Sequence, residues 1–491
     1  MKKTGLAVLV MLMAVLSVMV IRTLMFRSHS LDLPAAAPLT LDREAVLARL
    51  SSAVRLETVS AEAPGQADPA PFLAFQDLLD RSFPAIARTL EKEVINGQAL
   101  VYKWPGRNPD LLPGALLAHY DVVPVARETL ARWQHPPFGG DVGEGFVWGR
   151  GTLDMKGTLM AILESVEALA GQGFVPDRTL YLAFGQDEEV GGKAGAARIA
   201  EHFQQAGVRL AFTLDEGMVI LNPALSPSGQ QVAVIGVAEK GYATLEITAQ
   251  GQGGHSSMPP RHTAVGELAA AAASLEANPM PASLSGPVGL FFDAVGPGLP
   301  FAQRLLFANQ WAFEPLLVSV LEKKVSTNAM IRTTTALTMI QGGIKENVLP
   351  DQARLLVNFR LLPGDTGEAV LAHAQKVIGN DRIKIRFHND WVNEASPVSA
   401  TDSEAFAALS RTVAQVFGNT PSAPGLVLAA TDSKHYTAIT DNCYRFSPFV
   451  FGPEDLPRIH GVNERVSVEG YLKAILFYAR FIEAVCGAKG V

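Results

Sequence analysis

The chain has 491 residues, of which 48 are acidic and 41 basic, giving a formal net charge of −7 at pH 7. Apolar residues make up 48% of the sequence and charged residues 18%, a balance that excludes a disordered, fibrous or coiled-coil protein. No long basic run occurs, so nucleic acid is not an expected partner, because phosphate binding requires a concentrated cationic surface.

The N-terminus carries the longest apolar run of the chain, Leu6–Ile21, which comes shortly after Lys2 and Lys3. A membrane helix needs about 20 apolar residues, and this run approaches that length when it is counted through Phe26. We therefore expect residues 1–30 to form an uncleaved signal anchor, with the lysines cytoplasmic and the rest of the chain exported. The alternative is a cleaved signal peptide and a secreted protein.

Strands and helices alternate along the next segment, residues 40–238. Hydrophobic spacing predicts helices over residues 45–50, 71–90, 158–170 and 194–206, and short apolar runs predict strands over 99–104, 114–119, 178–184 and 208–214. Strands that alternate with helices are typical of βαβ units, so we expect a mostly parallel sheet.

The pattern changes within residues 239–392. Residues 243–249 alternate apolar and polar positions, which is typical of a half-exposed strand. The same reasoning predicts helices over 264–275 and 367–378 and strands over 353–360 and 384–387, whereas residues 280–330 are apolar without a clear period.

The βα pattern returns in residues 393–491, with helices predicted over 404–417 and 468–485 and a strand over 426–429. The predicted fold is therefore an α/β domain with a mostly parallel sheet, built from residues 40–238 and 393–491, into which a smaller α+β unit of residues 239–392 is inserted. Two cysteines, Cys443 and Cys486, are too few for a disulfide scaffold, and we expect them to stay free rather than pair.

Acidic residues and a histidine follow successive strands of the larger domain, where ligand sites of open α/β sheets lie. They are His119, Asp154, Glu188, Glu189 and Asp215. Asp121 is two residues from His119 and shares its face on an extended chain, and a metal-binding imidazole commonly donates its other N–H to a carboxylate.

Each of these residues has a simpler explanation when it is taken alone. A single histidine is usually an ordinary polar residue, Asp154 before a helix is a typical N-cap, and Glu188 with Glu189 is a typical solvated pair. Several carboxylates at one sheet edge repel one another, and divalent cations remove that repulsion. Imidazole and carboxylate ligands without cysteine suit Zn²⁺, with Mn²⁺ or Co²⁺ as alternatives.

Four motifs in this order resemble the M20 metallopeptidases, especially their carboxypeptidase S and N-acyl-amino-acid amidohydrolase branch. The motifs are His119-x-Asp121, Gly151-Thr152-Leu153-Asp154-Met155-Lys156-Gly157, Asp187-Glu188-Glu189-Val190-Gly191-Gly192 and Arg458-Ile459-His460-Gly461-Val462-Asn463-Glu464. The resemblance extends over about residues 45–485 and implies a zinc-peptidase catalytic domain with an inserted lid.

The resemblance also implies two zinc ions per subunit and a role for each ligand. His119, Asp154 and Asp215 would hold one ion, and Asp154 would bridge to a second ion held by Glu189 and His460. Glu188 would be the general base that activates a metal-bridging hydroxide, and Asp121 would orient His119.

The inserted unit resembles the family lid, which dimerises in many members. His255 matches a lid histidine that reaches the active site, often from the partner subunit, to stabilise the oxyanion. Asn347 and Arg360 match lid residues that hold the substrate carboxylate or carbonyl. Lys434 stands where the family usually has arginine, so carboxylate recognition is expected to differ there. The apolar residues 281–318 either shape an acyl or side-chain pocket or simply pack the lid.

The expected function is hydrolysis of an amide or peptide bond next to a free carboxylate, as in a carboxypeptidase. The alternatives are hydrolysis or synthesis of N-acyl amino acids and, in a different class, a catalytically inactive relative that binds ligands. The expected partners are a small peptide or N-acyl amino acid as substrate, the membrane through the N-terminal helix, and a second copy of the chain through the lid.

Overall fold

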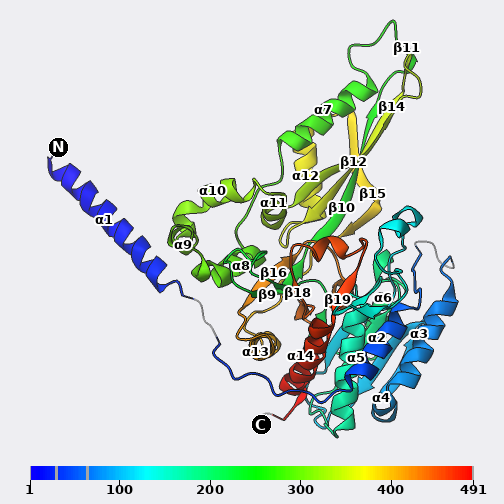
Figure 1. The fold of residues 1–491 in the computed structure, drawn as a ribbon. Helices are drawn as coiled ribbons and strands as arrows, with labels where there is room; N and C mark the ends of the chain where they lie inside the picture. Colours follow the sequence, from blue (N-terminus) through cyan, green and yellow to red (C-terminus); the bar gives the residue numbers. More distant parts are fainter. Residues whose placement is uncertain (1, 28–30, 62–65, 489–491) are drawn as a thin grey trace.

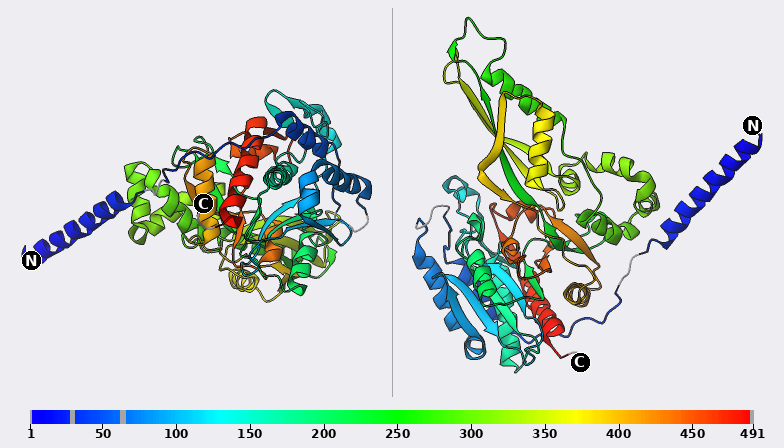
Figure 2. Two further views of the ribbon diagram at one scale, coloured as in Figure 1. Left: turned by 90° about the horizontal axis from the view of Figure 1, so that it is seen from below. Right: turned by 180° about the vertical axis from the view of Figure 1, so that it is seen from behind.

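A computed structural model of the protein describes residues 2–27, 31–61 and 66–488, which form a main domain, an elongated lid and a protruding N-terminal helix (Figure 1). Met1 and residues 28–30, at the two ends of the predicted anchor segment, lie outside the described residues. The N-terminal helix, α1, spans Lys2–Met25 and projects away from the two domains in all views (Figures 1 and 2).

The main domain contains one large mixed sheet in which the central pairings are parallel, as predicted. Its strands, in spatial order, are β1 (Glu91–Ile95), β2 (Ala99–Trp104), β6 (Leu180–Gly185), β3 (Gly114–His119), β7 (Phe212–Asp215), β17 (Cys443–Arg445), β9 (Val232–Glu239), β8 (Ile220–Leu221) and β18 (Val450–Phe451), and β16 (Ser422–Val427) also pairs with β9. Strand β3 is parallel to both β6 and β7, so the carboxyl ends of these three strands meet at one edge.

Helices cover both faces of this sheet. They are α2 (Arg43–Val54), α3 (Pro69–Ser82), α4 (Pro84–Thr89), α5 (Lys156–Gly171), α6 (Ala196–Gln205), α13 (Glu404–Val416) and α14 (Val468–Cys486). Alternate residues of β3 enter different layers: Leu116 packs in the cluster of α5 and α14, whereas Leu117 packs with α6. Burial on both faces explains why these strands are continuous apolar runs without alternation. Both cysteines are buried free thiols.

The lid is a four-stranded antiparallel sheet in the order β12-β14-β10-β15, with two helices on one face. Its elements are β10 (Gly241–Gln250), α7 (Ala264–Ala277), β12 (Thr334–Gly342), β14 (Gln352–Leu361), α12 (Gly367–Ile378) and β15 (Ile383–Asn393). Leu245 and Ile247 on β10 are buried under the helices, whereas Glu246 between them binds Arg354 and Arg386 on the opposite face. Apolar and polar residues thus face opposite sides of β10, as their alternation predicts, but the polar side is not exposed as expected, because Glu246 and Thr248 are also buried.

The apolar segment without a clear period folds as four short helices, called the helical insert below. They are α8 (Pro287–Val295), α9 (Phe301–Ala308), α10 (Gln310–Leu321) and α11 (Val325–Ile331). Buried side chains of the insert, such as Phe292 and Leu317, cluster with Val234 on β9 and Leu426 on β16. The insert therefore packs on the large sheet of the main domain, although its sequence lies within the lid segment.

Two small sheets complete the fold. One consists of β4 (Val142–Gly143), β5 (Phe146–Trp148) and β19 (Arg465–Ser467) and so joins the first part of the main domain to its C-terminal part. The other pairs β11 (Gly254–His255) with β13 (Val348–Leu349) at the far end of the lid (Figure 1).

Candidate active site

Histidines and carboxylates converge at the carboxyl edge of the three parallel strands. His119 is the last residue of β3, and Glu188 and Glu189 form a short 3-10 helix soon after β6. Glu216 follows the last residue of β7, Asp154 lies just before α5, and His460 precedes β19. The fold thus brings together side chains that are more than 300 residues apart in the sequence.

Asp154 lies at the centre of this cluster, between the two histidines. Its Oδ1 atom is 3.1 Å from Nε2 of His119, and its Oδ2 atom is 3.0 Å from Nε2 of His460. Nε2 of His460 is also 3.1 Å from Oε2 of Glu189. One carboxylate therefore faces two imidazoles with its two oxygens, which is the arrangement required of a ligand that bridges two cations.

Asp121 orients both His119 and the segment that carries the two glutamates. Its Oδ1 lies 3.2 Å from Nδ1 of His119, and the backbone N–H groups of Glu188 and Glu189 donate to its two oxygens at 3.1 and 3.2 Å. Nδ1 of His119 is also 3.1 Å from the carbonyl oxygen of Asp121. Because Nδ1 is engaged in this way, Nε2 is the nitrogen that faces the cluster.

The structure differs from the sequence prediction at the end of β7. Glu216, which the sequence analysis did not select, places Oε1 at 3.2 Å from Nε2 of His119. The predicted ligand Asp215 instead accepts hydrogen bonds from the backbone N–H and the hydroxyl of Ser433, at 2.8 and 2.9 Å. Successive residues at a strand end point to opposite sides, so only one of this pair faces the cluster. The sequence shows two adjacent acidic residues at this strand end, Asp215 and Glu216, so Glu216 could have been considered as a ligand from the sequence alone.

Glu464 is a second residue whose role the sequence did not reveal. It is fully buried, and its Oε1 accepts hydrogen bonds from the backbone N–H groups of Gly151 at 2.9 Å, Leu153 at 2.9 Å and Asp154 at 3.3 Å. Its Oε2 accepts a hydrogen bond from Arg150 at 2.6 Å. Glu464 thereby fixes the loop of Asp154 to the segment that carries His460. Glu464 is the last residue of the fourth sequence motif, and this position was the only indication in the sequence that it has a role at the site.

The cluster holds more negative charge than its two imidazoles balance. Burial, reinforced by the Asp154 carboxylate, raises the pKa of Glu216 to about 8. Burial likewise raises the pKa of Glu188 well above its usual value, and Glu216, Asp432 and Asp154 add to that effect. Burial opposes protonation of His119, yet the nearby carboxylates, Glu216 first, raise its pKa well above the ordinary value. A divalent cation among these groups would remove the repulsion.

Comparison with known proteins decides the family. Residues 115–484 match Peptidase family M20/M25/M40. The probable carboxypeptidase S-like 2 of Dictyostelium discoideum is 39% identical over 484 residues, which cover 96% of this chain and 92% of the relative. The chain belongs to peptidase family M20/M25/M40. This result confirms the resemblance on which the sequence motifs were interpreted.

Two further similarities are informative about this M20 chain. N-fatty-acyl-amino acid synthase/hydrolase PM20D1 of Xenopus tropicalis is 41% identical over 446 residues, which cover 90% of this chain and 86% of the relative. The crystal structure of the M20 family metallo-carboxypeptidase Sso-CP2 from Sulfolobus solfataricus aligns with a TM-score of 0.63 at 18% identity. That alignment covers 89% of this chain and 98% of the other, so the fold is the M20 fold. The protein is a hydrolase of the metallopeptidase and amidohydrolase type.

The donor set fits the metal dependence of the M20 family. Imidazole nitrogens and carboxylate oxygens of His119, Asp154 and Glu189 lie within 4.8 Å of one another, as do those of His119, Glu188 and Glu216. The second oxygen of Glu189 is buried without a hydrogen-bond partner among the described residues. Nitrogen and oxygen donors without thiolate suit Zn²⁺, Mn²⁺ or Co²⁺.

The four candidate residues outside the cluster lie in three different places. Lys434 is in the 3-10 helix Asp432–Tyr436, where its charge acts on Asp187 and Asp432. Arg360 lies near the end of β14, with its guanidinium over the ring of Tyr242 at 4.8 Å from the centroid. Tyr242 begins the lid next to β9, so Arg360 is at the root of the lid.

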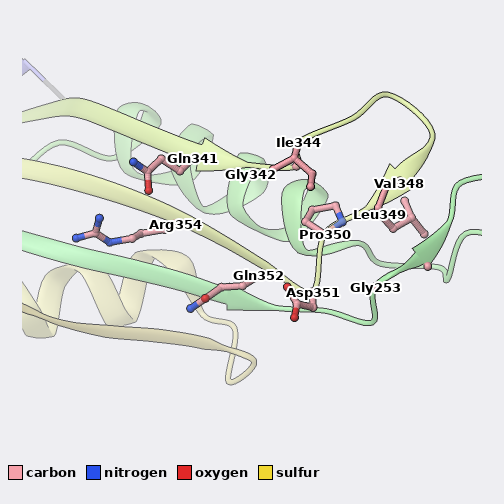
Figure 3. A pocket seen from close by; sticks show the side chains of 12 residues that line it. Gly253, Gln341, Gly342, Ile344, Val348, Leu349, Pro350, Asp351, Gln352 and Arg354 are labelled. Carbon is pink, nitrogen blue, oxygen red and sulfur yellow. The ribbon is translucent and has the colours of Figure 1, made fainter.

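His255 and Asn347 lie at the opposite, distal end of the lid (Figure 1). His255 is exposed, pairs with Val348, and its Nδ1 is 2.8 Å from the hydroxyl of Ser257. The carbonyl of Asn347 accepts a hydrogen bond from the backbone of Ser256 at 3.2 Å, so the two candidates share one tip. A hollow beside them is lined by Gly254, Ile344, Val348 and Asp351, among others, and contains no member of the metal cluster (Figure 3).

Proposed function

We propose that the protein is a zinc-dependent hydrolase that cleaves an amide or peptide bond next to a free carboxylate. His119 and Glu216 would hold one ion, His460 and Glu189 the other, and Asp154 would bind both. The observation that carries this assignment is the division of the Asp154 oxygens between His119 at 3.1 Å and His460 at 3.0 Å. Glu216 takes the place that the sequence prediction gave to Asp215.

The metal ions, when bound, polarise the scissile carbonyl and lower the pKa of a water molecule. Glu188 is placed to accept the proton of that water and to return it to the leaving nitrogen, because its carboxylate lies within 4.8 Å of the His119 and Glu216 donor atoms. Asp121 holds the backbone of Glu188 and so fixes the position of the base.

Two cations are candidates for binding the free carboxylate of the substrate. Lys434 follows Ser433, which binds Asp215 beside the cluster residue Glu216, and Arg360 lies at the root of the lid. Lysine is a point donor without the bidentate fork of arginine, so Lys434 would hold one carboxylate oxygen. A carboxypeptidase-like substrate, with its carboxylate next to the scissile amide, fits this arrangement.

Hydrolysis or synthesis of N-acyl amino acids is the second candidate. It is favoured by the 41% identity to the PM20D1 of Xenopus tropicalis, whose name describes an N-fatty-acyl-amino acid synthase/hydrolase. Both candidate substrates present an amide next to a carboxylate, so the same cluster serves either reaction. They differ in what lies on the acyl side of the amide. A catalytically inactive binding protein is the minor alternative.

A substrate panel tests the proposal and separates these candidates. We expect the zinc-loaded protein to hydrolyse dipeptides with a free C-terminal carboxylate, and kcat/KM to fall about 10- to 100-fold for the matching C-terminal amides, because a charge-assisted hydrogen bond is lost. If kcat/KM instead rises strongly with acyl length among N-acyl amino acids, by up to about 4-fold per methylene, the second candidate holds. Equal rates on acids and amides would contradict both candidates, and no hydrolysis at all would support the binding protein.

We also propose that His255 acts in the active site of a partner subunit. It lies at the distal tip of the lid, whereas the metal cluster lies in the main domain of the same chain (Figure 1). Ser257 engages its Nδ1, so Nε2 is the nitrogen left for a substrate oxygen. Homodimerisation through the lid would bring this tip, together with Asn347, to the second cluster. An oxyanion donor of this kind typically contributes about 10²–10³-fold in kcat.

Coexpression of two inactive variants tests whether His255 completes the active site of the partner subunit. His255→Ala and Glu188→Ala should each be nearly inactive alone, whereas coexpression of the two chains should restore about one quarter of wild-type activity, because half of the dimers are mixed and each has one complete site. Coexpression of each variant with itself, under a second affinity tag, is the control. Heterodimers that form and yet show no recovered activity would place His255 outside the partner's site.

The N-terminal helix supports a membrane-anchored, exported enzyme, with secretion after cleavage as the alternative. The most apolar 18-residue window of Thr4–Met25 has a mean hydropathy of 2.7, and only 6% of that window is buried within the protein. A core helix of a soluble protein would be mostly buried, so we propose that α1 spans the membrane and tethers the hydrolase to it.

A further inference from the structure

The helical insert has an apolar face that no other part of the described chain covers. On α10, Trp311 is 61% exposed, Leu316 48% and Val320 51%. Trp311 and Pro315 are four residues apart on one side of α10, and Leu316 and Val320 are four residues apart on another side, so the exposed apolar side chains cover a broad part of the helix surface. Phe301 at the start of α9 is 50% exposed. Exposed apolar patches of this kind mark surfaces that contact a partner or a membrane.

The last turns of α1 dock on this insert. Asn309, between α9 and α10, is buried and donates to the carbonyl of Met19 at 3.1 Å and to the hydroxyl of Thr23 at 3.3 Å. Nε of Arg22 donates to the carbonyl of Ala308 at 3.2 Å. Figures 1 and 2 show α1 passing beside α9 before it extends away from the molecule. Met19 and Thr23, at 7% and 0% exposure, stand out as buried in an otherwise exposed helix.

The length of α1 beyond this contact is too short to span a bilayer alone. Residues 4–18 precede the first docked residue, and at about 1.5 Å per residue they extend about 22 Å. The hydrocarbon core of a bilayer is about 30 Å thick. In a bilayer crossed by α1, the remaining thickness would therefore surround the docked turns, and α9 and α10, which contact those turns, would lie at that depth.

We propose that α9 and α10 form a second membrane-contact surface, which lies in the interface of the bilayer that α1 crosses. The inference rests on the membrane anchoring proposed above. The missing depth of about 8 Å matches the 5–10 Å to which interfacial helices are buried. Tryptophan is enriched at this level of a membrane, and Lys323 and Lys324 at the end of α10 are placed to meet lipid headgroups. The surface would fix the orientation of the enzyme against the bilayer.

Tryptophan quenching by brominated lipid tests the proposal on the full chain. Zinc-loaded protein is reconstituted in phosphatidylcholine vesicles with or without bromine on the acyl chains, and emission is compared. Helix α1 contains no tryptophan, so any quenching reports on the rest of the protein. We expect Trp311→Phe to lose most of the quenching seen in the wild type. The matched variant Trp391→Phe should retain it, because Trp391 is 47% exposed but lies on β15 in the lid.

A second pair of variants tests the surface without removing the reporter. Leu316→Asp with Val320→Asp should weaken the quenching of Trp311, whereas Ile344→Asp, at a lid position that is 98% exposed, should not. Hydrolysis of a soluble substrate should be unchanged in both. Protein that floats with the vesicles but shows no quenching overturns the inference and leaves the anchor intact. The same holds for quenching that persists in Trp311→Phe. Protein that does not float with the vesicles overturns both the contact surface and the membrane anchor. The hydrolytic function is tested separately by the substrate panel.

Discussion

Replacing Glu188 by glutamine is expected to lower kcat by about 10²–10⁴-fold, the contribution of a well-placed general base. Glutamine keeps the size of the side chain and its fixed position beside Asp121, but it cannot accept and return a proton. Asp121 binds the backbone N–H of residue 188, a contact that the substitution leaves in place. Stopped assays of hydrolysis, with zinc content measured by mass spectrometry on the same samples, check the result.

The neighbouring glutamate provides the contrast. Glu189 lies 3.1 Å from His460, so Glu189→Gln should lower both the rate and the amount of bound zinc, whereas Glu188→Gln should lower the rate at nearly full zinc occupancy. Glu201→Gln, at an exposed position on α6, is the control for mutation itself. A Glu188→Gln protein that retains wild-type kcat with full zinc would exclude Glu188 as the base.

Hydrophobic period predicted most elements of the fold because their burial is regular. The predicted strands at residues 99–104 and 114–119 and the helix at 367–378 have the bounds of β2, β3 and α12. These elements are buried on both faces or along one clear stripe, so burial leaves its period in the sequence. The same argument predicts the main sheet to be mostly parallel, because helices separate its strands.

The helical insert was not predictable in the same way. Its helices are short, α8 with 9 residues, α9 with 8 and α11 with 7, and too brief to establish a period. Some of their apolar residues are buried against β9 and β16, and others are exposed on the side near α1. Because apolar residues occur on nearly all sides of these helices, the sequence shows no helical period. Of the two alternatives for this segment, simple packing within the lid differs from the structure, in which the insert packs on the large sheet of the main domain.

The strand order predicts only some of the residues that form the metal cluster. Parallel strands explain why His119 and the two glutamates meet at one edge, because their strands are neighbours in the sheet. Nothing in spacing alone places His460 there, since it arrives from a loop more than 300 residues away, and the family resemblance supplied that residue. Either Asp215 or Glu216 can face His119, depending on the orientation of the strand end. In the structure Ser433 binds Asp215, and Glu216 therefore faces His119.

Replacing Asp154 by asparagine is expected to have the largest effect on the metal centre, because Asp154 faces both histidines. A neutral amide at this position removes the negative charge shared by the two sites, so both ions should bind far more weakly. Loss of their stabilisation of the transition state, worth several kcal/mol, corresponds to about 10³-fold or more in kcat/KM. His119→Ala and His460→Ala should each weaken mainly one site.

Zinc titration followed by thermal unfolding gives a readout that does not depend on activity. Binding to the folded state alone raises stability by RT ln(1 + [L]/Kd), so the wild type should show a rise in Tm with added zinc, and Asp154→Asn should show little or none. Glu216→Gln and Asp215→Asn form the matched pair. Only the first should reduce the zinc-dependent rise, because Glu216 faces His119 whereas Asp215 is held by Ser433. An undiminished rise in Asp154→Asn would show that this carboxylate does not join the two sites.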